Sequence, residues 1–130
     1  MSPVYGFLGA LLVTVGMLVG AAITGRKRKI PMHIAFVTAA VSGLGVAIYF
    51  ALKVGELYDL EKAGMITPIH LTLARVTTAA YLWPLVTGPL AMRGKIRPRI
   101  HHFGAYVALV LTLAATVTGV MMLYGAERLV

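Results

Sequence analysis

The sequence predicts an all-α integral membrane protein built as a four-helix bundle. Of its 130 residues, 59% are hydrophobic and only 12% are charged, a balance too apolar for a soluble domain of this length. A membrane-spanning helix needs about 20 apolar residues, and four such stretches cover about 4–24, 31–53, 67–92 and 100–125. We therefore expect residues 1–130 to form a single transmembrane domain, with any chemistry located between the helices or at their ends.

The distribution of charges predicts how the chain is oriented. Eight basic residues fall in the loops after the first and third stretches: Arg26, Lys27, Arg28, Lys29, Arg93, Lys95, Arg97 and Arg99. By the positive-inside rule both loops face the cytoplasm, which puts both termini on the outer side. Orientation is the preferred explanation of the net charge of +8, with recognition of nucleic acid or of anionic lipid as the alternative. We expect membrane lipid around the chain and no nucleic-acid partner.

Prolines and glycines mark where helices begin and where they pack closely. Pro31, Pro68 and Pro98 stand at the starts of the second, third and fourth stretches, where a missing amide donor costs little. Gly16 and Gly20 form a GxxxG pattern in the first stretch, which favours close helix packing in lipid. That first stretch lacks a basic leader and is longer than the apolar core of a signal peptide, so we expect a retained span.

Histidines are the candidate ligands, because the chain has four of them and no cysteine. His33 and the pair His101/His102 begin the second and fourth stretches, so they share the cytoplasmic level of the bilayer. His70 begins the third stretch and therefore lies near the outer side. About 20 helical residues at 1.5 Å each separate the two levels, so His70 cannot share a metal ion with the other three.

The surroundings of His101 favour a flat ring over a small ion. Gly104, Ala105 and Ala108 follow it on the same helical face and predict a shallow groove for a porphyrin edge. Zinc sites more often cluster three or four ligands, whereas two imidazoles facing each other suit six-coordinate haem b. We predict His33 and His101 as ligands, with His102 as the alternative to His101. His70 is the candidate ligand of a second site, so one haem b is predicted and a second remains open.

Arg75 is a charged residue inside the third stretch, where a charge is costly. It either extends to the outer surface or pairs with an anionic or polar group, such as a haem propionate or a quinone headgroup. Together with His70 and Glu56 it suggests an outer site for quinol.

The chain resembles a family of small bacterial and archaeal four-helix membrane proteins of uncharacterised function. The resemblance runs from about Arg28 to Leu123. It is carried by the basic lead into His33, by His70 early in the third stretch, by Arg93-Gly94 ahead of His101, and by Thr118-Gly119-Val120. Some members assist cytochrome oxidase assembly, and their histidines are proposed to bind metal or haem. The family usually has a further histidine late in the second span, where this chain has residues 51–53, Ala-Leu-Lys. The chain is similar, more distantly, to diheme b-type membrane cytochromes.

Three functions are therefore expected, in this order. The first is a haem b protein that carries electrons in the cell membrane of a bacterium or archaeon, as a small cytochrome or a subunit of a respiratory complex. The second is an assembly or haem-handling factor for cytochrome oxidase, and the third is an accessory subunit without a cofactor. A larger redox complex or a second copy of the chain is the expected partner. Catalysis by this chain alone is not expected, because the sequence has no paired carboxylates, Ser/His/Asp set or phosphate loop.

Overall fold

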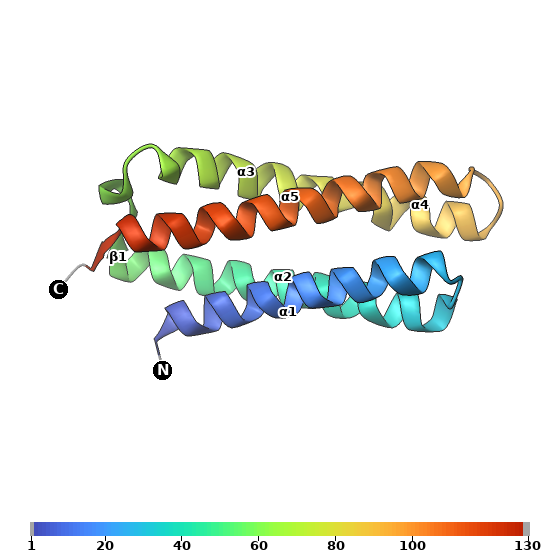
Figure 1. The fold of residues 1–130 in the computed structure, drawn as a ribbon, viewed down its shortest axis with the longest axis horizontal. Helices are drawn as coiled ribbons and strands as arrows, with labels where there is room; N and C mark the ends of the chain where they lie inside the picture. Colours follow the sequence, from blue (N-terminus) through green and yellow to red (C-terminus); the bar gives the residue numbers. More distant parts are fainter. Residues whose placement is uncertain (1, 129–130) are drawn as a thin grey trace.

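The computed structural model describes residues 2–128 and consists of four antiparallel rods (Figure 1). The first, second and fourth rods are single helices, whereas the third contains two helices in succession. Their bounds are α1 Pro3–Arg26, α2 Ile30–Leu57, α3 Ile66–Ala80, α4 Leu82–Met92 and α5 Pro98–Gly125. The predicted all-α four-helix fold is confirmed.

Three of these helices, α1, α2 and α5, are long and apolar enough to cross a membrane, as expected of a multi-pass membrane protein. Neither α3 nor α4 is long enough alone, but together they cover the predicted stretch 67–92. The helix is interrupted at Tyr81, three residues before Pro84. Proline cannot donate a hydrogen bond and its ring crowds the carbonyl four residues earlier, here that of Ala80, which interrupts the helical ladder. This division was not predicted.

The turns after α1 and α4 lie side by side at one end of the bundle and are built alike (Figure 1). Each contains a residue with positive φ, Arg28 at 56° and Gly94 at 70°. In each, the next N–H bonds to the carbonyl five residues back, with distances of 2.9 Å for Lys29 to Thr24 and 2.9 Å for Lys95 to Leu90. This is the Schellman arrangement that ends a helix. We call this end, residues 26–29 and 93–99, the basic end.

The opposite end holds both chain ends (Figure 1) and the connection from α2 to α3. We call this end, residues 56–65 and 126–128, the acidic end. A short strand β1, Tyr58–Asp59, pairs antiparallel with β2, Glu127–Arg128, and a single 3₁₀ turn η1, Leu60–Ala63, follows β1. The hydroxyl of Thr67 also donates a hydrogen bond to the carbonyl of Leu60. The connection from α2 to α3 is thereby joined to the end of α5.

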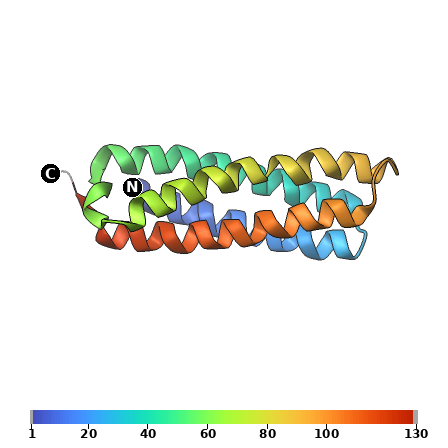
Figure 2. The same ribbon diagram turned by 90° about the horizontal axis from the view of Figure 1, so that it is seen from above.

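The helices pack as two hairpins. α1 packs along α2, and α5 packs along α3 and α4, while the two hairpins meet along α1 and α5. The two perpendicular views in Figures 1 and 2 show the rods at the corners of a square in which α2 and α5 are diagonal. Residues at the basic ends of α2 and α5 can therefore approach each other across the bundle interior.

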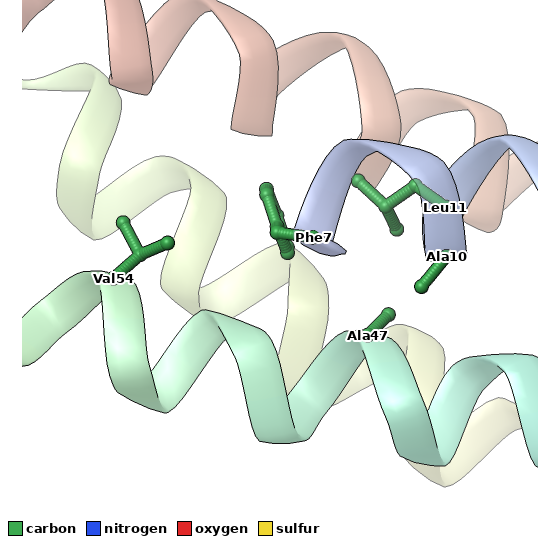
Figure 3. Packing of buried hydrophobic residues seen from close by; sticks show 5 residues of the cluster. All are labelled: Phe7, Ala10, Leu11, Ala47 and Val54. Atoms are coloured by element: carbon green, nitrogen blue, oxygen red, sulfur yellow. The ribbon is translucent and has the colours of Figure 1, made fainter. Parts of the chain in front are cut away.

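Small residues let the helices approach closely. Phe7, Ala10 and Leu11 of α1 pack against Ala47 and Val54 of α2 in the hydrophobic cluster of the first hairpin (Figure 3). Elsewhere in this hairpin the rings of Phe36 and Phe50 lie where side chains on Gly20 and Gly6 would project. Of the GxxxG pair, Gly20 thus makes room for the Phe36 ring between α1 and α2, whereas nothing lies within 4 Å of the Cβ position of Gly16.

Candidate functional site

His33 is the fourth residue of α2 and lies against the end of α1. Its Nδ1 is 2.7 Å from the carbonyl oxygen of Ala21. Because a carbonyl only accepts hydrogen bonds, Nδ1 must carry the proton, which leaves a lone pair on Nε2. The ring also lies over Gly25, where a Cβ would be 3.0 Å from Nδ1. Helix α1 therefore fixes both the orientation and the tautomer of His33.

His101 is the fourth residue of α5 and is held by α4 in the same way. Its Nδ1 is 3.2 Å from the hydroxyl oxygen of Thr87. That hydroxyl donates its own proton to the carbonyl of Trp83 at 2.7 Å, so it accepts from Nδ1–H of His101 and leaves Nε2 with the lone pair. The ring lies over Gly88, where a Cβ would be 3.3 Å from Cε1.

The two imidazoles meet across the bundle, with ring centres 6.1 Å apart and planes nearly perpendicular at 88°. Two imidazoles that share one metal ion have centres about 6 Å apart, because each metal–nitrogen bond is about 2.0 Å and the ring centre lies about 1 Å behind the nitrogen. The structure thus brings His33 and His101 together at the separation of two ligands on opposite sides of one ion. The pair also links the two hairpins at the basic end.

His70 lies at the other end of the bundle, buried between α3 and α5. Its Nδ1 is 2.9 Å from the hydroxyl oxygen of Thr118, which itself donates to the carbonyl of Ala114 at 2.9 Å. Its ring lies over Gly119, where a Cβ would be 3.0 Å from Cε1. His70 thus has the same kind of support as His101, but neither His33 nor His101 is near it.

A repeated dipeptide underlies these three environments, and it was not predicted from the sequence. The chain contains three Thr-Gly dipeptides, at 24–25, 87–88 and 118–119, and each supplies the glycine beneath one histidine. In the second and third, the threonine also accepts the Nδ1 hydrogen bond. Threonine accepts such a bond from a helix interior because it satisfies its own proton on the preceding turn. The recurrence of Thr-Gly one helix away from each histidine was the available signal.

The other predicted site residues lie apart from this pair. His102 is exposed, with its ring centre 5.8 Å from that of His101, and it makes no hydrogen bond to another residue of the described chain. Arg75 is exposed on α3 while His70 is buried, and five residues separate them by about 140° around the helix. The structure therefore places Arg75 and His70 on different faces of α3.

The predicted groove at Gly104 is filled by a side chain. A Cβ at Gly104 would lie 1.6 Å from Cδ1 of Trp83, so the indole rests directly on the α5 backbone one turn after His101. The indole N–H donates to the carbonyl of Ile100 at 3.0 Å. In this structure a flat ligand ligated by His101 does not have the Gly104 surface available unless Trp83 moves.

The charges around the pair are all positive. The eight basic residues of the basic end are exposed, and the acidic residues Glu56, Asp59 and Glu61 lie at the acidic end, where Glu56 pairs with Lys53 at 3.5 Å. Within residues 2–128, no three His, Cys, Asp or Glu side chains come together to hold a metal ion. Besides the exposed His102, the donors of this chain at the basic end are therefore the imidazoles of His33 and His101, which lie at the same end as the eight cations.

Comparisons of the chain with known protein families, with curated proteins and with solved structures find no match. The resemblance drawn from short motifs stays a prediction, and the functional argument rests on the geometry of the site.

Proposed function

We propose that this protein binds haem b between His33 and His101 and carries electrons, as a small cytochrome or as the cytochrome subunit of a respiratory membrane complex. The observation that carries the proposal is the His33–His101 pair. Two imidazoles from diagonal helices lie 6.1 Å apart, and each donates Nδ1–H to a fixed acceptor on its neighbouring helix. Such hydrogen bonds orient metal-binding histidines and strengthen Nε2 as a ligand.

The charge distribution supports haem over a bare metal ion. Eight exposed cations lie at the same end of the bundle as the pair, whereas the acidic side chains that the structure describes, Glu56, Asp59 and Glu61, lie at the opposite end. This positive field repels a dication held by only two imidazoles. Haem carries two propionate groups, which the same cations attract. Bound haem iron would supply a one-electron couple between its two oxidation states, which is the chemistry of an electron carrier.

The chain's own residues have defined tasks in this proposal. Ala21 and Thr87 hold the imidazoles at the correct tautomer, and Gly25 and Gly88 leave room for the rings. We place the basic end at the cytoplasmic face of the cell membrane of a bacterium or archaeon, in accordance with the positive-inside rule. A larger redox complex, or a second copy of the chain, is the partner we propose, with a quinol as candidate electron donor.

The test is a reduced-minus-oxidised visible spectrum of the purified protein, with a pyridine haemochrome assay to count haem per chain. We expect a low-spin b-type spectrum with one haem. His33→Ala and His101→Ala should each abolish it, whereas His102→Ala should leave it. A folded protein from a haem-replete host that contains no haem, or a spectrum lost only with His102→Ala, would overturn this assignment.

The alternative, an accessory subunit or a transient haem-handling factor, is favoured by the packing of Trp83. The indole fills the surface at Gly104, and within residues 2–128 every buried polar side-chain atom has a hydrogen-bond partner. The described part of the chain thus has no buried polar side-chain atom that requires a ligand as its partner. Haem that is substoichiometric and lost on gel filtration would indicate the handling factor, and unchanged assembly of all histidine variants would indicate the accessory subunit.

A further inference from the structure

The basic end carries a surface that the haem proposal does not use fully. Its eight cations are all exposed: Arg26, Lys27, Arg28, Lys29, Arg93, Lys95, Arg97 and Arg99. Two propionates would neutralise two of them. The turns that carry the cations lie at the same end of the bundle in Figure 1, so the remaining positive charge is concentrated at that end.

The helix ends add to this positive potential. The N-cap residues of α2 and α5 are themselves cations, Lys29 and Arg97, and neither helix has an acidic residue in its first turn or a side-chain cap. The positive ends of two 28-residue helices thus coincide with the basic side chains, where acidic residues would ordinarily be favourable.

Arg28 is a second observation that bears on this surface. Its φ is 56°, and the equivalent position in the other turn is Gly94, with φ 70°. Glycine is the usual residue at this helix-ending position because a side chain is strained in the left-handed region. The chain therefore holds an arginine where backbone geometry favours glycine.

We propose that the basic end, residues 26–29 and 93–99, is a binding surface for the phosphate headgroups of anionic phospholipids. A group of cations beside transmembrane helices is attracted to anionic lipid at its own membrane surface, and the acidic side chains that the structure describes, Glu56, Asp59 and Glu61, lie at the opposite end of the bundle. The inference does not rest on haem binding.

The experiment compares spin-labelled phosphatidylglycerol with spin-labelled phosphatidylcholine around the full-length protein in phosphatidylcholine bilayers. We expect wild type to prefer phosphatidylglycerol, with a preference that falls as salt shortens the screening length. Arg28→Gly should lower the preference about two- to fivefold, and it should fold at least as well as wild type because it relieves strain. Lys62→Gln, which removes one exposed cation at the acidic end, is the matched control and should leave the preference unchanged.

Three further variants make the result decisive. Replacing all of 26–29 or the four cations of 93–99 by Gln should abolish most of the preference, and exchanging the arginines for Lys should retain it. No preference in wild type, a salt-independent preference, or equal losses in Arg28→Gly and Lys62→Gln would each overturn the proposal. Haem content is measured on the same samples, so that failure of the lipid proposal can be distinguished from failure of the proposal that the protein binds haem.

Discussion

An alanine at position 25 should weaken haem binding without weakening the fold. A Cβ at Gly25 would lie 3.0 Å from Nδ1 and 3.1 Å from Cε1 of His33, whereas favourable contacts between carbon atoms are about 3.5–4.0 Å. The imidazole must therefore move by roughly half an ångström, and its 2.7 Å hydrogen bond to Ala21 is lengthened or lost. Outer partners of metal-binding histidines contribute about 10- to 100-fold in affinity, so we expect haem affinity to fall about tenfold.

The same substitution has a compensating effect on the helix. Replacing glycine by alanine inside a helix stabilises it by up to about 1 kcal/mol, which offsets the loss of one hydrogen bond at about 1 kcal/mol. Global stability should therefore change little. Gly16→Ala is the matched control, because it lies on the same helix with nothing within 4 Å of its Cβ, and it should leave haem affinity unchanged.

The assay is a titration of the apoprotein with haemin, followed by absorbance, alongside thermal unfolding by circular dichroism. Gly88→Ala should have a smaller effect, because its Cβ would be 3.3 Å from Cε1 of His101. It should weaken haem binding by about threefold, which is less than the effect of losing the hydrogen bond that supports a metal-binding histidine. The reasoning is refuted if Gly25→Ala binds haem as tightly as wild type, or if Gly16→Ala weakens binding equally.

Three further predictions follow from the second hairpin. Thr87→Val removes the acceptor for Nδ1–H of His101 and should lower haem affinity about tenfold, whereas Thr87→Ser should retain it; equal titrations for the two variants would contradict the role of the hydroxyl. Trp83, the single tryptophan of the chain, packs on Gly104, one turn after His101, so haem should quench its fluorescence with the stoichiometry of binding; unchanged emission would place haem elsewhere. Tyr81→Phe removes the 2.9 Å hydrogen bond to Thr112 and should cost about 1 kcal/mol of stability with unchanged haem content; loss of haem in this variant would show that Tyr81 supports the site.

The fold class followed from the sequence because the spans are set by hydropathy over some twenty residues, which averages out local detail. The predicted stretch 4–24 is α1, Pro3–Arg26, and 100–125 is α5, Pro98–Gly125. The break at Tyr81 was missed although Pro84 was visible, because a proline within an apolar run does not by itself show whether neighbouring helices support a continuous span. The pair β1–β2 was also missed, since two residues per strand carry no periodic signal.

The level of the site along the bundle was predictable from the sequence, but its detailed geometry was not. The common level of His33 and His101 follows from alternating spans, and the structure brings their rings together. Their hydrogen-bond acceptors were not foreseen, because Ala21 acts through its backbone and Thr87 belongs to a helix whose rotation is set by tertiary packing. The groove at Gly104 was read from one helix alone, and the indole that fills it comes from the neighbouring helix.

The two hairpins are built on the same plan at the basic end. Each has a first helix containing a Thr-Gly dipeptide, a Schellman turn with a positive-φ residue, and a second helix whose fourth residue is His33 or His101. His33 and His101 thus occupy corresponding positions of the two hairpins, and their rings meet at the basic end. The bis-imidazole pair therefore uses the same local arrangement twice, once in each hairpin.

The acidic end departs from this plan, which accounts for the solitary position of His70. His70 is the fifth residue of α3, and the fifth residue of α1 is Phe7. Thr118-Gly119, which supports His70, occupies places 21 and 22 of α5, and the corresponding places of α2 hold Phe50-Ala51. The first hairpin has thus built a hydrophobic cluster from Phe7 and its neighbours where the second has built a histidine site. Since Phe7 and Phe50 cannot ligate metal, the first hairpin has no counterpart of the His70 site, which is consistent with the proposed single haem per chain.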